Sequence, residues 1–112
     1  MSITFTSTLL RENVVGVEKA MDWQIILTGT YVTGGFSITP ANLGLDTIDF
    51  VAIMPDGSGA NTNGVALVVP NLSTNLWLLY GTGAADTDAF DQIGNGNTIT
   101  GFTFIARVYG VA

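Results

Sequence analysis

The stretch from Tyr31 to Ile53, YVTGGFSITPANLGLDTIDFVAI, decides the fold of this chain. It contains, in order, the end of a strand, a Gly-Gly turn, a Pro-Asn loop and an apolar strand. Thr39 could cap a single helical turn near Pro40 to Leu43, because proline at the first helical position loses no hydrogen bond. The stretch therefore predicts two strands joined by a structured loop.

The segments on both sides of this stretch show the two-residue alternation of β-strands. The alternating positions are Met21, Trp23, Ile25, Leu27 and Tyr31; Ile48, Phe50, Ala52 and Met54; Val65, Leu67 and Val69; Leu76, Leu78 and Tyr80; and Phe102, Phe104, Ala106 and Val108. Val51 and Ile53 make the other face of the second segment apolar too, so we expect that strand to be covered on both sides. Seven or eight short strands, separated by turns rich in Gly, Asn and Asp, predict an antiparallel all-β sandwich of the jelly-roll or Greek-key kind.

Length and composition narrow the class of protein. The 112 residues are expected to form one domain, residues 1–112, with residues 1–8 as an arm or an edge strand. Only 11% of residues are charged and 47% are apolar, so some apolar surface is expected to meet a partner or a second copy. The net charge is −6, with Arg11, Lys19 and Arg107 as the only cations, which argues against nucleic acid as a partner.

The chemical inventory argues against an enzyme. The chain has no His and no Cys, which removes the commonest general base, the usual zinc ligands and the thiolate nucleophile. Asp86, Asp88 and Asp91 are close enough in sequence to suggest a calcium loop, but their spacing lacks the ligand, glycine and terminal glutamate that such a loop needs. A solvated acidic loop is therefore favoured, and we expect no catalytic residue, cofactor or metal. A small hydrolase that uses two carboxylates is the weakest alternative.

Eight positions of the opening stretch carry a resemblance to a known family. They are Tyr31, Thr33, Gly34, Gly35, Pro40, Leu43, Gly44 and Leu45. In this order they resemble a segment of the small decoration, or cement, proteins on the heads of tailed bacteriophages. Phe36 departs from that pattern, because an acidic residue often follows the two glycines in the family.

The resemblance implies a structural function. It implies a β-sandwich, a homotrimer and a place on the outer surface of the virion, where each trimer would join subunits of the major capsid protein. The chain has no signal peptide and no apolar run long enough for a membrane span, so we expect synthesis in the host cytoplasm and no membrane partner.

Four residues are candidates for an interface: Trp77, Phe36, Ile3 and Phe5. Trp77 is out of phase with Leu76 and Leu78, so it either faces outward as an interface anchor or packs inside a sheet that is covered on both faces. Ile3 and Phe5 belong to the strand-prone segment Ser2 to Thr8, which could pair with a neighbouring subunit or form an edge strand of its own domain. The alternative function is a carbohydrate- or receptor-binding module of a phage tail or fibre, with Trp77, Tyr80 and the Asn/Asp loops as its platform.

Overall fold

The computed structural model describes residues 3–55, 65–81, 91–94, 96 and 98–111, and most of them lie in antiparallel strands. The long sheet has the order β1-β2-β8-β4 and consists of β1 (Thr4–Val15), β2 (Glu18–Thr30), β8 (Thr98–Val111) and β4 (Thr47–Pro55). The short sheet has the order β3-β6-β5, with β7 also paired to β6, and consists of β3 (Phe36–Ser37), β6 (Leu76–Gly81), β5 (Val65–Asn71) and β7 (Asp91–Gln92). The predicted antiparallel all-β sandwich is confirmed.

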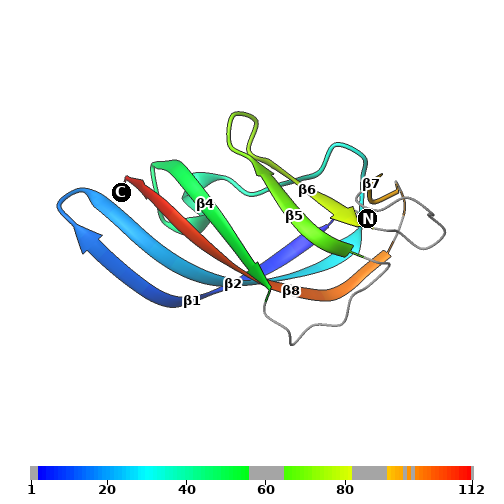
Figure 1. Ribbon diagram of the computed structural model, residues 1–112, viewed down its shortest axis with the longest axis horizontal. Helices are drawn as coiled ribbons and strands as arrows, with labels where there is room; N and C mark the ends of the chain where they lie inside the picture. The colour runs from blue at the N-terminus through cyan, green and yellow to red at the C-terminus, as the bar shows by residue number, and fades with distance from the viewer. Residues whose placement is uncertain (1–2, 56–64, 82–90, 95, 97, 112) are drawn as a thin grey trace.

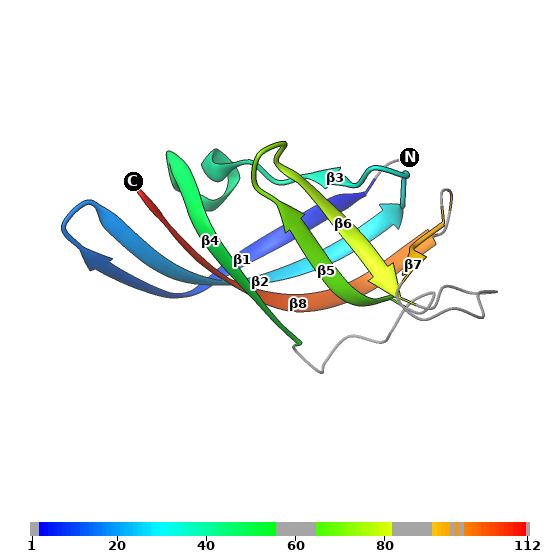
Figure 2. The ribbon, with the colours of Figure 1, turned by 45° about the horizontal axis from the view of Figure 1, so that its top comes forward.

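The two sheets differ in length, and this gives the molecule its elongated shape. Its principal extents are 48 × 27 × 25 Å. In Figures 1 and 2, β5 and β6 lie across the curved long sheet, whereas the turn between β1 and β2 extends beyond them at one end. One end of the long sheet is therefore not covered by the short sheet.

The core lies between the inner faces of the two sheets. The alternation predicted for β2 and β8 is confirmed, because Ile25 and Leu27 are fully buried and stand opposite Phe104 and Phe102. Trp23 is only partly buried and packs against this core. From the short sheet, Trp77 reaches the same core, where its ring centroid lies 6.3 Å from that of Phe104.

In β6, the buried face is opposite to the one that the alternation of Leu76, Leu78 and Tyr80 suggested. Trp77 and Leu79 are fully buried, whereas Leu76 is exposed. On the neighbouring strand Val68 points inward, and Leu67 and Val69 are exposed. Both faces of these strands are apolar, so only the position of the long sheet decides which face enters the core. Pro70 continues β5 because β5 is an edge strand, where the missing N–H is tolerated.

β4 is covered on one side, not on both. A register shift between Ile48 and Phe50 places Ile48 on the inner face, together with Val51 and Ile53. Phe50 and Met54 point the other way and are exposed. The prediction of two covered faces is therefore wrong for the isolated chain.

The opening stretch builds the connection between β2 and β4. Its helical turn is confirmed as a 3₁₀ helix, η1 (Pro40–Leu43), with Thr39 as its N-cap. The Thr39 side chain accepts from the Asn42 backbone N–H at 3.4 Å, and the Asn42 side-chain oxygen Oδ1 accepts from the Thr39 backbone N–H at 2.8 Å, which is a capping box. Gly44 ends the helix in the left-handed conformation. No helix in the described ranges is long and apolar enough to cross a bilayer.

β1 and β2 form a long hairpin, of which the alternation pattern indicated only the part from Met21 onward. Its two-residue loop is Gly16–Val17, between the paired residues Val15 and Glu18. Gly16 supplies the positive φ of 64° that such short loops require. The sequence VVGVEK contained this turn signal. The segment from Thr4 to Thr8 pairs with β2 of its own chain, so it is part of the edge strand of the long sheet.

Candidate functional site

None of the four candidate interface residues is exposed. Trp77 and Phe36 are buried, because β3 and β6 pair with each other and turn both rings into the core. The outward position considered for Trp77 is therefore wrong, and Phe36 is not an exposed contact either. Ile3 and Phe5 are partly buried and pack against the same core. Of the platform expected for a tail module, Trp77 is buried and Tyr80 is partly exposed, while the Asn/Asp-rich segments 56–64 and 82–90 lie outside the described residues.

Exposed apolar side chains lie at the uncovered end of the long sheet instead. We call the residues Leu9, Leu10, Val14, Val15 and Val17 the hairpin patch. Val17, at the tip of the loop, is 69% exposed. The short sheet does not reach the turn between β1 and β2 (Figure 1), and all five side chains are exposed. The sequence signal for the patch was the pair of valines before Gly16.

The outer face of the long sheet carries an ion pair at its centre. Arg107 on β8 stands opposite Asp22 on β2 and donates two hydrogen bonds to it, Nε to Oδ1 at 2.7 Å and Nη2 to Oδ2 at 2.9 Å. Asp22 is only 8% exposed. The hydrogen bonds from Arg107 lower the pKa of Asp22 against the opposing effect of burial, and the charges of Arg107 and Arg11 lower it further. The same pair raises the pKa of Arg107.

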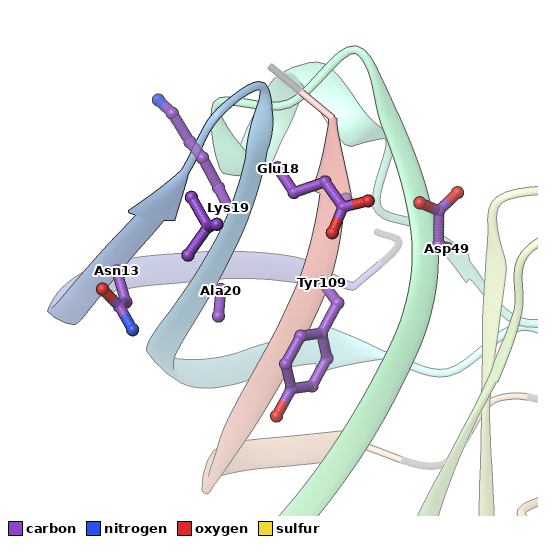
Figure 3. A pocket seen from close by; sticks show the side chains of 8 residues that line it. Asn13, Glu18, Lys19, Ala20, Asp49 and Tyr109 are labelled. Atoms are coloured by element: carbon purple, nitrogen blue, oxygen red, sulfur yellow. The ribbon is translucent and has the colours of Figure 1, made fainter.

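Two hollows lie on this face of the long sheet and share three lining residues, Asn13, Ala20 and Tyr109. The first has a volume of about 390 Å³, and its other lining residues are Val15, Glu18, Lys19, Asp49 and Gly110. The second has a volume of about 310 Å³, and its other lining residues are Arg11, Asp22 and Arg107. We call the two together the outer groove. Figure 3 shows the first hollow, with Asn13 on β1, Ala20 on β2, Tyr109 on β8 and Asp49 on β4.

Tyr109, which lines both hollows, forms an aromatic pair with Phe50 on the neighbouring strand β4. The ring centroids of Phe50 and Tyr109 are 5.6 Å apart at an interplanar angle of 45°. Phe50 is 57% exposed and Tyr109 is 38% exposed. Aromatic rings prefer such tilted packing, and an exposed ring offers an apolar face to a ligand. The alternation of β8 placed Tyr109 on the polar face, but the sequence contained no signal that Phe50 would stand beside it.

The charges of the groove are mixed. All three cations of the chain line the two hollows, although the chain has a net charge of −6. Glu18, Asp22 and Asp49 line them as well. Lys19 is 3.3 Å from the carboxylate of Glu12, and Asp22 is paired with Arg107. Among the described residues, Arg11, Glu18 and Asp49 make no ion pair, so their polar groups remain available to a ligand.

The chemistry of the groove supports binding better than catalysis. Glu18 and Asp49 line one hollow, as the carboxylate-hydrolase alternative requires, but both residues are exposed. General acid catalysis by a carboxyl group near neutral pH depends on burial or a close like charge. No group of three or more metal-ligating side chains occurs in the described ranges. Asp86 and Asp88 of the acidic loop lie outside the described residues.

Comparisons with protein-family models, with curated proteins and with solved structures found no match. The hairpin patch, the outer groove and the sequence resemblance are therefore the features that bear on function. The patch offers apolar contact area at one end of the molecule. The groove offers hydrogen-bonding groups and an aromatic pair on the outer face of the long sheet.

Proposed function

We propose that this chain is a structural virion protein that decorates the outside of a tailed-phage head and stabilises contacts between major capsid protein subunits. The observation that carries the proposal is the hairpin patch, which presents exposed apolar side chains at the end of an elongated molecule. The resemblance of the segment from Tyr31 to Leu45 supplies the phage and the capsid. The scarcity of charged residues, 11% of the chain, agrees with a protein that works in contact with others.

The mechanism is thermodynamic. A decoration protein that binds the assembled shell but not free coat subunits shifts the assembly equilibrium toward the shell. The hairpin patch would bury its valines and leucines against a coat subunit, and each methylene that leaves water contributes about 0.8 kcal/mol. A homotrimer would present three patches at one threefold site, so that weak single contacts combine into strong binding.

The tail-module alternative loses one part of its expected platform. It needed Trp77 in an exposed aromatic row, and Trp77 is fully buried. Tyr80 alone does not form a platform, because its partly buried ring lies among the apolar residues of the short sheet's outer face. No observation at that face favours a polar ligand.

Binding to phage heads that lack this chain tests the proposal. We expect Val17→Glu to weaken co-sedimentation with such heads by about tenfold or more, because it places a charge in an apolar contact. Val32→Glu is the matched control, since Val32 is also exposed, at 48%, and lies outside the hairpin patch. Thermal unfolding of both variants checks that they fold. Failure of the unmodified chain to bind heads, or equal binding by both variants, would overturn the proposal.

A further inference from the structure

The outer groove adjoins the hairpin patch, with which it shares Val15, but its chemistry differs from that of the patch. Its polar side chains come from β1, β2, β4 and β8, and its one aromatic lining residue is Tyr109 on β8, with Phe50 of β4 packed beside that ring. We propose that the outer groove binds an uncharged oligosaccharide. This inference does not depend on the proposed function, because the residues that would contact the ligand, Asn13, Asp49 and Tyr109, lie outside the hairpin patch.

The mixture of charges selects the class of ligand. Three cationic and three anionic side chains line the groove, and Arg11, Glu18 and Asp49 are the ones without an ion pair among the described residues. A polyanion would be repelled by the two carboxylates, and a polycation by Arg11. A sugar hydroxyl both donates and accepts, so one sugar can bond to a carboxylate and to a guanidinium at once. The amide of Asn13 adds a donor and an acceptor.

The aromatic pair supplies the apolar contact that a sugar ring needs. One side of a pyranose ring consists largely of C–H groups and packs against an aromatic face. Tyr109 and Phe50 expose such faces at the edge of the groove. Ala20, the smallest side chain that lines both hollows, leaves room in front of Tyr109 (Figure 3).

The floor of the groove is held in place before any ligand arrives. The bidentate pair of Asp22 and Arg107 joins β2 to β8 and lines the second hollow. The guanidinium has five N–H donors, of which Asp22 takes two, so others can serve a ligand. A preorganised floor lowers the entropy lost on binding. The two hollows have room for a short oligomer because they adjoin, with volumes of about 390 and 310 Å³.

Titration with named sugars tests the inference. The probes are maltohexaose and chitohexaose, with a glycan array of neutral and sulfated oligosaccharides to widen the search, and amide shifts in NMR spectra locate the binding. We expect shifts at Asn13, Asp49 and Tyr109, and an affinity that changes little with salt, because the ligand carries no charge.

Variants of Tyr109 separate a sugar site from other occupants. Tyr109→Ala should lose about tenfold or more in affinity, whereas Tyr109→Phe, which keeps the ring, should stay within about threefold. Tyr80→Ala is the matched control on the short sheet. Three results would overturn the inference: no neutral sugar binds, only sulfated sugars bind with strong salt dependence, or Tyr109→Ala changes the solution mass. The last result would show that a second copy covers this face.

Discussion

Asp22 is the clearest case in which one residue ties two strands together. Its carboxylate is almost fully buried on the outer face of the long sheet, where an unpaired charge would be costly. Arg107 compensates with two short hydrogen bonds from the neighbouring strand. Because the pairing lowers the pKa of Asp22 in the folded state, the ion pair also links stability to pH.

Asp22→Asn should lower the free energy of unfolding by roughly 1–3 kcal/mol at neutral pH, because Arg107 loses its charged partner. The folded pKa of Asp22 is depressed, so its contribution is fully present above the unfolded value near 3.8 and is lost as the pH falls through the folded value. The difference between the two proteins should therefore shrink as the pH falls below about 4.

Urea unfolding at several pH values measures this difference. Asp49→Asn is the control, because Asp49 is exposed and has no ion pair with the described residues, and it should change stability by less than about 0.5 kcal/mol. A difference between wild type and Asp22→Asn that stays the same from neutral pH to acid would contradict the expectation.

Tyr31 is a buried residue whose hydroxyl group forms hydrogen bonds to the short sheet. Its hydroxyl accepts from the Leu79 N–H of β6 at 3.2 Å and from the Gln92 side chain of β7 at 2.6 Å. Tyr31 directly follows β2, so one phenol connects this end of the long sheet to two strands of the short sheet. Its backbone carbonyl also accepts from the Gly96 N–H at 2.8 Å.

Tyr31→Phe should destabilise the protein by roughly 1–3 kcal/mol, because a buried N–H on β6 loses its acceptor while the ring stays in place. Chemical denaturation with intrinsic tryptophan fluorescence measures this loss. Tyr80→Phe, at an outward-facing and partly buried position of β6, should have little effect. Equal losses in the two variants would show that the Tyr31 hydroxyl contributes nothing specific.

Among the elements, the loop before β3 depends on two glycines for different reasons. Gly34 and Gly35 have φ values of 105° and 100°, which side chains rarely adopt. A Cβ on Gly34 would meet open space, whereas a Cβ on Gly35 would collide with the backbone carbonyl oxygen of Trp77. The second glycine therefore allows the loop to approach β6 closely.

Alanine at each glycine tests this distinction. Gly34→Ala should cost about 1–2 kcal/mol for its backbone conformation alone. Gly35→Ala should cost about 1–3 kcal/mol more, because β6 must also move. Thermal unfolding of the two variants measures the gap between them. If Gly34→Ala were as destabilising as Gly35→Ala, the close approach to Trp77 would not be the cause.

At the scale of the whole molecule, the single chain exposes apolar side chains in two regions. The hairpin patch and the outer face of the short sheet, with Leu67, Val69 and Leu76, are both exposed in the single chain. Isolated apolar side chains on a surface are ordinary, but groups of them mark places where proteins meet. A self-associating protein is the expected consequence.

Light scattering after size exclusion should give a mass near three times 11.7 kDa, because the proposed function places the chain at threefold sites as a homotrimer. The mass should stay constant on dilution through the micromolar range if the trimer is preformed. A mass near 11.7 kDa at all concentrations would contradict the preformed trimer.

The sequence predicted those parts of the fold that depend on neighbouring residues. The alternation of β2 and β8 predicts their buried faces because polar and apolar side chains occupy opposite sides of each strand. The helical turn over Pro40–Leu43 depends on Thr39, Pro40 and Asn42, which lie within four positions. Composition alone excluded thiol and histidine chemistry.

The tertiary structure alone decided which face of an apolar strand turns inward and which residues meet. Trp77 enters the core because the long sheet covers that face of β6, and no pattern within β6 distinguishes its two apolar faces. The outer groove joins Asn13, Asp49 and Tyr109, which are far apart in the chain, because β2 and β8 pair and β4 adds at the edge. Local preferences depend on a few adjacent residues, whereas strand order results from long-range packing that local patterns do not record.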